Sequence, residues 1–187
     1  MIFVIFLFSI LIHELSHIFM GLILGYKLKN FRFIPFGAVI EFKELKKSKN
    51  EFLKNLLIYF SGPLSNFIMC YFVYISNYKI SKDIFYTNLI LGIFNLLPLT
   101  PLDGGKILKE LLKLVFSYKM SNIISYKINK FFLCIFTFLY SIFIIKLKNI
   151  SLLIILAYLW YIDIIETKKL ATLKKVYGLI EKSNFKY

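Results

Sequence analysis

The sequence predicts an all-α polytopic membrane protein, with about five transmembrane helices and a small β-hairpin after the first helix. The first observation behind this prediction is composition: 59% of the 187 residues are hydrophobic and the mean hydropathy is +0.72. Soluble domains are nearer about 45–50% apolar, so the excess is expected to contact lipid. The second is that the basic residues gather between apolar runs, and the third is a β-prone stretch at residues 31–42.

Apolar runs give the expected crossings, because a spanning helix needs about 20 mostly apolar residues. The candidates are residues 2–25, 55–76, 84–100, 131–145 and 150–165. The second run contains Gly62-Pro63, where we expect an internal break because proline cannot continue a regular helix. The last two runs are short, and about 15 residues cross only a thin or distorted bilayer core.

The basic residues predict the orientation of these crossings. Beginning with residues 26–54, the successive connections and the tail hold eight, two, six, two and six lysines or arginines. Cytoplasmic loops carry the excess of such residues, so the N-terminus is expected outside a bacterial cell membrane and the C-terminus inside. The net charge of +14 is then explained by contact with anionic lipid rather than with nucleic acid. We expect a membrane core at 1–167 and a short basic cytoplasmic tail at 168–187.

The β-prone stretch predicts a hairpin at the cytoplasmic end of the first helix. Phe31–Ile34 and Ala38–Phe42 flank the turn-forming residues Pro35-Phe36-Gly37. Aromatic and β-branched residues on both sides of such a turn are typical of paired strands. A partly buried interfacial loop is the alternative.

Both histidines of the chain lie in the first apolar run, within the stretch His13-Glu14-Leu15-Ser16-His17. Ionisable side chains inside a spanning helix are costly and are functional by default. His13 and His17 are four residues apart, so they share one face of a helix. Glu14 follows the first histidine, where it could accept a proton from an attacking water; this is the HExxH pattern of zinc hydrolases. The alternative is a pair of polar histidines without a metal.

A catalytic zinc site usually has three protein ligands and one open position. Most of the ten acidic residues fall in predicted loops, at the surface or at the cytoplasmic end of the last helix. Asp103 is different, because it lies in the stretch NLLPLTPLDGG, residues 95–105, whose prolines interrupt a helix and whose glycines permit unusual backbone shapes. Broken helices are tolerated at membrane depth where they line a cavity, so this segment could present Asp103, and with it Asn95, to the metal. A simple helix N-cap is the alternative for Asp103.

The HELSH motif, the GPLSN stretch at Gly62–Asn66 and the NLLPLTPLDGG stretch occur in this order. Together they resemble the site-2 protease family (M50) of intramembrane zinc metalloproteases, and within it the sporulation branch. The resemblance covers roughly residues 1–165. It implies that His13, His17 and Asp103 bind Zn²⁺ and that Glu14 is the catalytic base and later the acid. It also implies that Asn66 and Asn95 contact substrate or lie in a second shell.

The same resemblance implies hydrolysis of a peptide bond in a membrane-associated protein substrate near the cytoplasmic face. For the sporulation branch that substrate is a pro-sigma factor, and an inhibitory membrane partner is expected. The predicted hairpin would offer an edge strand to an extended substrate. The alternatives are a membrane metal transporter and an inactive scaffold homologue that use the same histidine and aspartate site.

Overall fold

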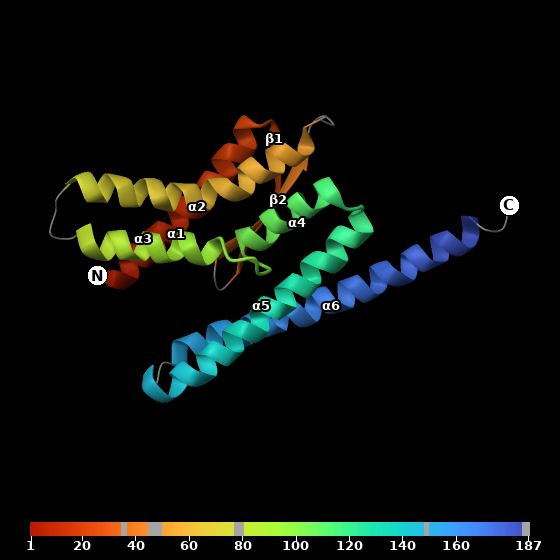
Figure 1. The fold of residues 1–187 in the computed structure, drawn as a ribbon. Coiled ribbons are helices and arrows are strands. Elements are labelled where there is room, and N and C mark those ends of the chain that lie inside the picture. Colours follow the sequence, from red (N-terminus) through yellow and green to blue (C-terminus); the bar gives the residue numbers. More distant parts are fainter. Residues whose placement is uncertain (35–36, 45–49, 77–80, 148–149, 185–187) are drawn as a thin grey trace.

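The computed structural model describes residues 1–34, 37–44, 50–76, 81–147 and 150–184. Six helices and one two-stranded sheet are found in these residues (Figure 1). In chain order they are α1 (Ile2–Ile23), β1 (Tyr26–Ile34), β2 (Gly37–Glu44), α2 (Glu51–Ser76), α3 (Ser81–Asn95), α4 (Asp103–Val115), α5 (Tyr118–Leu147) and α6 (Ile150–Asn184). The chain is therefore mostly helical, as predicted.

Three helices in the described part of the chain are long and apolar enough to cross a membrane: α1, α2 and the segment Tyr118–Ile142 of α5. Many apolar side chains of α1 face outward, and Phe3 and Phe19 are 69% and 67% exposed, which suits contact with lipid. The other two expected crossings, in α3 and α6, stay predictions. The third apolar run is helical only as far as Asn95, so α3 has 15 residues.

One expectation about helix boundaries was wrong, and one connection holds more helix than its charge suggests. The basic stretch 106–130, expected to connect the third and fourth crossings, holds most of α4 and the beginning of α5. Leu108, Leu111 and Leu112 recur at helical spacing among lysines, so α4 is amphipathic and its low mean hydropathy hid the pattern. The break expected at Gly62-Pro63 is absent, because α2 continues through Pro63 and forgoes the one backbone hydrogen bond that proline cannot donate.

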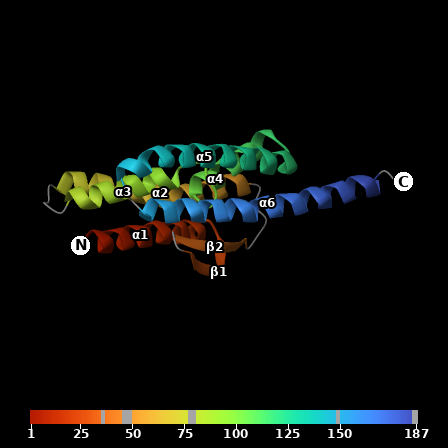
Figure 2. The ribbon, with the colours of Figure 1, turned by 90° about the horizontal axis from the view of Figure 1, so that it is seen from below.

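The predicted hairpin is confirmed in the backbone. β1 and β2 pair antiparallel, with Phe31 opposite Ile40, and both strands extend beyond the predicted pieces. Pro35 and Phe36 of the expected turn lie outside the described residues. Gly25, between α1 and β1, has a φ of 83°, a conformation that glycine adopts without steric cost. In Figure 2 the hairpin lies on the α1 side of the helices.

A small apolar cluster fixes the segment between α3 and α4. Leu99 and Leu102 of this segment are buried against Leu133 of α5 and Leu159 of α6. Close packing of these side chains holds the segment against two helices, because dispersion contacts sum over many atom pairs. Asp103 follows directly, and its position therefore depends on the packing of α5 and α6.

Candidate metal centre

Three ionisable side chains from two distant parts of the chain converge on one point. The Nε2 atoms of His13 and His17 each lie 3.0 Å from Oδ2 of Asp103, and they lie 3.2 Å from each other. All three residues are buried, with at most 6% of each exposed. The helix α1 supplies the two histidines from successive turns, and the first residue of α4 supplies the carboxylate.

Gly62 of α2 allows the helices to meet at this point. A Cβ atom at this position would overlap Nε2 of His17 and would lie 2.7 Å from Nε2 of His13. Only a residue without a side chain leaves room for both imidazoles where α2 crosses α1. Sequence reasoning treated Gly62 only as a helix break and as part of a motif, so its contact role was missed.

The far side of the His17 ring is anchored by the backbone of α2. Nδ1 of His17 lies 2.7 Å from the carbonyl oxygen of Ile58, to which it can only donate. The hydroxyl of Ser61 donates to the same carbonyl at 2.7 Å and is 3.4 Å from Nδ1. With its proton on Nδ1, the neutral ring leaves the Nε2 lone pair directed at Asp103 and available to a metal.

Asn66 plays the corresponding part for His13. Its Nδ2 atom lies 2.9 Å from Nδ1 of His13, while its Oδ1 is buried and has no hydrogen-bond partner among the described residues. A half-turn of the amide exchanges the two atoms, so that the Nδ1–H of His13 would donate to Oδ1. This arrangement satisfies the orphaned oxygen and leaves Nε2 of His13 free to bind a metal.

The donor set fits zinc. Two imidazole nitrogens and one carboxylate oxygen are the kind of ligands that a catalytic zinc takes, with a fourth position left open. Tetrahedral ligands at about 2.0 Å from zinc are separated by about 3.3 Å. The observed separations of 3.0–3.2 Å are close to that value. His13, His17 and Asp103 are the one group of three potential ligands among the described residues.

Asp103 is paired with a cation, which favours the charged form of its carboxyl group. Nζ of Lys106 donates to Oδ1 of Asp103 at 2.9 Å. Oδ2 faces the histidines, so the two oxygens have different partners.

The segment before Asp103 is fixed by a buried amide on α5. The backbone N–H of Thr100 donates to Oδ1 of Asn129 at 2.7 Å, and Nδ2 of Asn129 donates to Oδ1 of Asp163 on α6 at 3.1 Å. Asn129 and Asp163 are 4% and 3% exposed. These hydrogen bonds link α6 and α5 to Thr100, three residues before Asp103.

Replacing Asn129 by Ala is therefore expected to weaken zinc binding by about tenfold, because the partly buried N–H of Thr100 loses its acceptor and the segment can shift. The measurement is zinc affinity by competition with a chelator. Asn122→Ala is the matched control, since the Asn122 amide, also on α5, donates to the carbonyl of Tyr118 within the same helix. Equal affinity in the two variants would contradict a role for Asn129 in placing Asp103.

The remaining predicted residues lie in different relations to this group. Glu14 is half-buried and directly follows the first histidine of the site on α1. Asn66 contacts His13, as described. The Nδ2 atom of Asn95 donates to the carbonyl of Leu91 within α3, so Asn95 is not brought into the metal group. Lys106 and Asn129 were not predicted from the sequence. Their roles follow only from contacts in the folded structure, and no sequence motif marks them.

Comparison with known proteins gives the family of the chain. The sequence matches the profile of Peptidase family M50 over residues 1–83 and 77–139, which together cover most of the chain. The chain belongs to peptidase family M50. The fold agrees with this membership: a solved structure of the site-2 protease from Methanocaldococcus jannaschii matches 90% of this chain and 76% of its own, at 25% identity and a TM-score of 0.62.

Two curated M50 relatives extend the comparison. A zinc metalloprotease from Methanocaldococcus jannaschii is 30% identical over 137 residues, which cover 68% of this chain and 39% of the relative. Stage IV sporulation protein FB from Bacillus subtilis is 28% identical over 151 residues, which cover 76% of this chain and 50% of the relative. The chain thus spans half or less of the length of these curated relatives. The resemblance noted in the sequence is confirmed at the level of the family.

Proposed function

We propose that this M50 protein is an intramembrane zinc metalloendopeptidase that hydrolyses a peptide bond of a membrane-associated protein near the cytoplasmic face. The observation that carries the proposal is that the ligand atoms of His13, His17 and Asp103 lie within 3.2 Å of one another. Glu14 directly follows His13 on α1. The name of the zinc metalloprotease relative supports the reaction class.

The chain's own residues divide the chemistry between them. A zinc ion held by His13, His17 and Asp103 would lower the pKa of water from 15.7 to about 7 and polarise the scissile carbonyl. Glu14 accepts the proton of the attacking water and then passes it to the leaving amine. The carbonyl of Ile58 and the amide of Asn66 hold the two imidazoles in the orientation that binding requires. A contact of Asn95 with substrate stays part of the proposal.

Water and substrate would reach the site from different directions. In the orientation that the basic residues predict, His17 lies six residues, or about 9 Å, from the cytoplasmic end of α1, and His13 lies about 15 Å from it. Cytoplasmic water is within reach at that depth.

An apolar groove of about 540 Å³ between α1 and α2 is lined by Leu15, Phe19 and Ser61. The apolar lining of the groove suits an apolar segment of a membrane protein. Ser61 in its wall also approaches His17, so such a segment would lie near the metal group.

The substrate proposal goes further than the reaction class. We take a pro-sigma factor processed during sporulation as the substrate, with an inhibitory membrane partner, and the similarity to Stage IV sporulation protein FB supports this choice. The hairpin β1–β2 is proposed to pair with an extended substrate segment through its free edge, since strand addition supplies main-chain hydrogen bonds.

A membrane metal transporter is the rival function. Transport favours several ligand sets along a path, whereas the described residues hold one such group. The buried position of that group and the place of Glu14 directly after His13 in the sequence favour hydrolysis. An inactive scaffold would have no use for the complete ligand set.

The test is loss of metal and of cleavage together in Asp103→Ala. Removal of a ligand is expected to lower zinc affinity by at least about tenfold and to abolish cleavage of a candidate pro-sigma factor by the reconstituted full chain. Zinc is measured by elemental analysis and cleavage by gel electrophoresis. Asp83→Ala on α3 removes an equal charge outside the site and serves as the control. If the Asp103 variant retains zinc and cleavage, the proposed site is wrong.

A further inference from the structure

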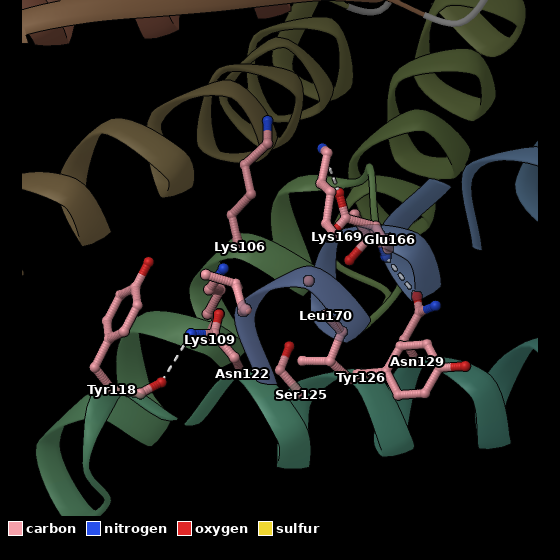
Figure 3. A pocket seen from close by; sticks show the side chains of 13 residues that line it. Lys106, Lys109, Tyr118, Asn122, Ser125, Tyr126, Asn129, Glu166, Lys169 and Leu170 are labelled. Carbon is pink, nitrogen blue, oxygen red and sulfur yellow. Dashed lines mark hydrogen bonds and ion pairs between the residues drawn. The ribbon is translucent and has the colours of Figure 1, made fainter. Parts of the chain in front are cut away.

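A second cavity, separate from the metal centre, lies between α4, α5 and α6. Its volume is about 340 Å³, which is at the small end of the range for ligand sites. Figure 3 shows its walls: Lys106 and Lys109 come from α4, Ser125 from α5, and Glu166 and Lys169 from α6. Neither the metal ligands nor the proposed hydrolysis uses this cavity.

We propose that this cavity binds a phosphate group. Three lysines and one glutamate line it. Lys106 is paired with Asp103 and Lys169 with Glu166, so the positive charge of Lys109 is left without a partner among the described residues. A phosphate group is negatively charged at pH 7 and complements that charge. The small volume suits a lipid headgroup or a small phosphorylated molecule.

The three lysine ammonium groups differ in whether they already have an acidic partner. Lys106 donates to Asp103 at 2.9 Å, and Lys169 donates to Glu166 at 2.8 Å. Lys109 forms no ion pair or hydrogen bond with any residue that the structure describes, although its side chain is only partly exposed. Lysine binds phosphate as a point charge, so Lys109 is the cation most available to such a ligand.

A neutral donor in the same wall supports the assignment. Ser125 is 8% exposed, and its hydroxyl has no hydrogen-bond partner among the residues in the described ranges. The hydroxyl is therefore available, in the wall of a cationic cavity, to donate to a ligand that accepts hydrogen bonds. A phosphate oxygen would accept from Ser125 while its charge is balanced by Lys109.

The cavity also adjoins the metal centre. Thr100 and Gly105, on either side of Asp103, form part of its wall, and Lys106 reaches both the cavity and Oδ1 of Asp103. A phosphate that draws on Lys106 would compete with Asp103 for this ammonium. Occupancy of the cavity is thereby linked to the charge around a metal ligand.

The experiment measures phosphate binding to the purified full chain in a zwitterionic detergent. Glycerol 3-phosphate is titrated by calorimetry, and bound phosphatidylglycerol is counted by native mass spectrometry against phosphatidylcholine. Lys109→Gln is expected to lower the affinity for the probe by about tenfold, since a charge-assisted contact is lost. Lys113→Gln is the control, since it removes the same charge from α4. Lys113 pairs with Glu110 at 2.6 Å and does not line the cavity, so this variant should bind the probe with the affinity of the wild type.

Each outcome decides the proposal or the source of the phosphate. Saturable binding of glycerol 3-phosphate, weakened in Lys109→Gln and Ser125→Ala only, supports a soluble ligand. The same pattern for phosphatidylglycerol alone supports a lipid headgroup. Equal weakening in Lys109→Gln and Lys113→Gln would reduce the effect to general surface charge and overturn the site. Absence of saturable binding by either probe to a folded, monodisperse protein would overturn it as well.

Discussion

Replacement of Glu14 by Gln is expected to reduce peptide-bond cleavage by at least about a hundredfold while zinc content stays near that of wild type. General acid–base catalysis by a positioned side chain contributes roughly 10²–10⁴-fold, and glutamine cannot accept the proton of water. The ligands His13, His17 and Asp103 are untouched by the change. Single-turnover cleavage and elemental zinc analysis of the same preparation give the two readings.

The matched control for this experiment is Glu51→Gln, which makes the same change in the first turn of α2, where the residue is exposed. It should retain both zinc and cleavage. A Glu14→Gln protein that cleaves at the wild-type rate would remove Glu14 from the mechanism. That result would also favour the transporter or scaffold alternatives, because neither requires a base at this position.

The second large effect is expected at Gly62. Gly62→Ala should lower zinc affinity by at least about tenfold, because the added Cβ would overlap Nε2 of His17 and crowd Nε2 of His13. Alanine favours a helix interior by about 0.8–1.0 kcal/mol over glycine, so α2 itself is not weakened. A loss of zinc in a protein with unchanged helix content would therefore come from the contact with the imidazoles.

Zinc affinity is measured by chelator competition, with helix content from circular dichroism. Leu64→Ala, two residues along α2, removes side-chain volume from a residue that is 41% exposed and outside the metal group, so zinc affinity should be unchanged. A Gly62→Ala protein with wild-type affinity would mean that α1 and α2 can separate at no cost. The close approach of α2 would then not be a requirement of the site.

Local chemistry made part of this site predictable. His13 and His17 are separated by one helical turn, and they are the only histidines of the chain, so spacing alone placed them on one face. Asp103 followed from elimination and from the prolines around it. The hairpin followed from turn residues between β-prone pieces, and the structure pairs those same pieces.

The rest of the site depends on contacts between residues far apart in the chain. Gly62 meets histidines more than 40 residues away, and Asn129 meets a backbone N–H that is 29 residues away. No local pattern marks either contact. The extent of the amphipathic helix α4 was not predicted for a different reason: a search for long apolar runs passes over a helix whose lysines are interspersed with leucines.

The most direct test of the metal centre is X-ray absorption spectroscopy at the zinc edge of the purified full chain, with Asp103→Ala alongside. The structure predicts one zinc per chain with two imidazole nitrogens and carboxylate oxygen at about 2.0–2.2 Å, and loss of that signal in the variant. A zinc with sulfur ligands, or a spectrum without imidazole, would contradict the assignment of His13, His17 and Asp103.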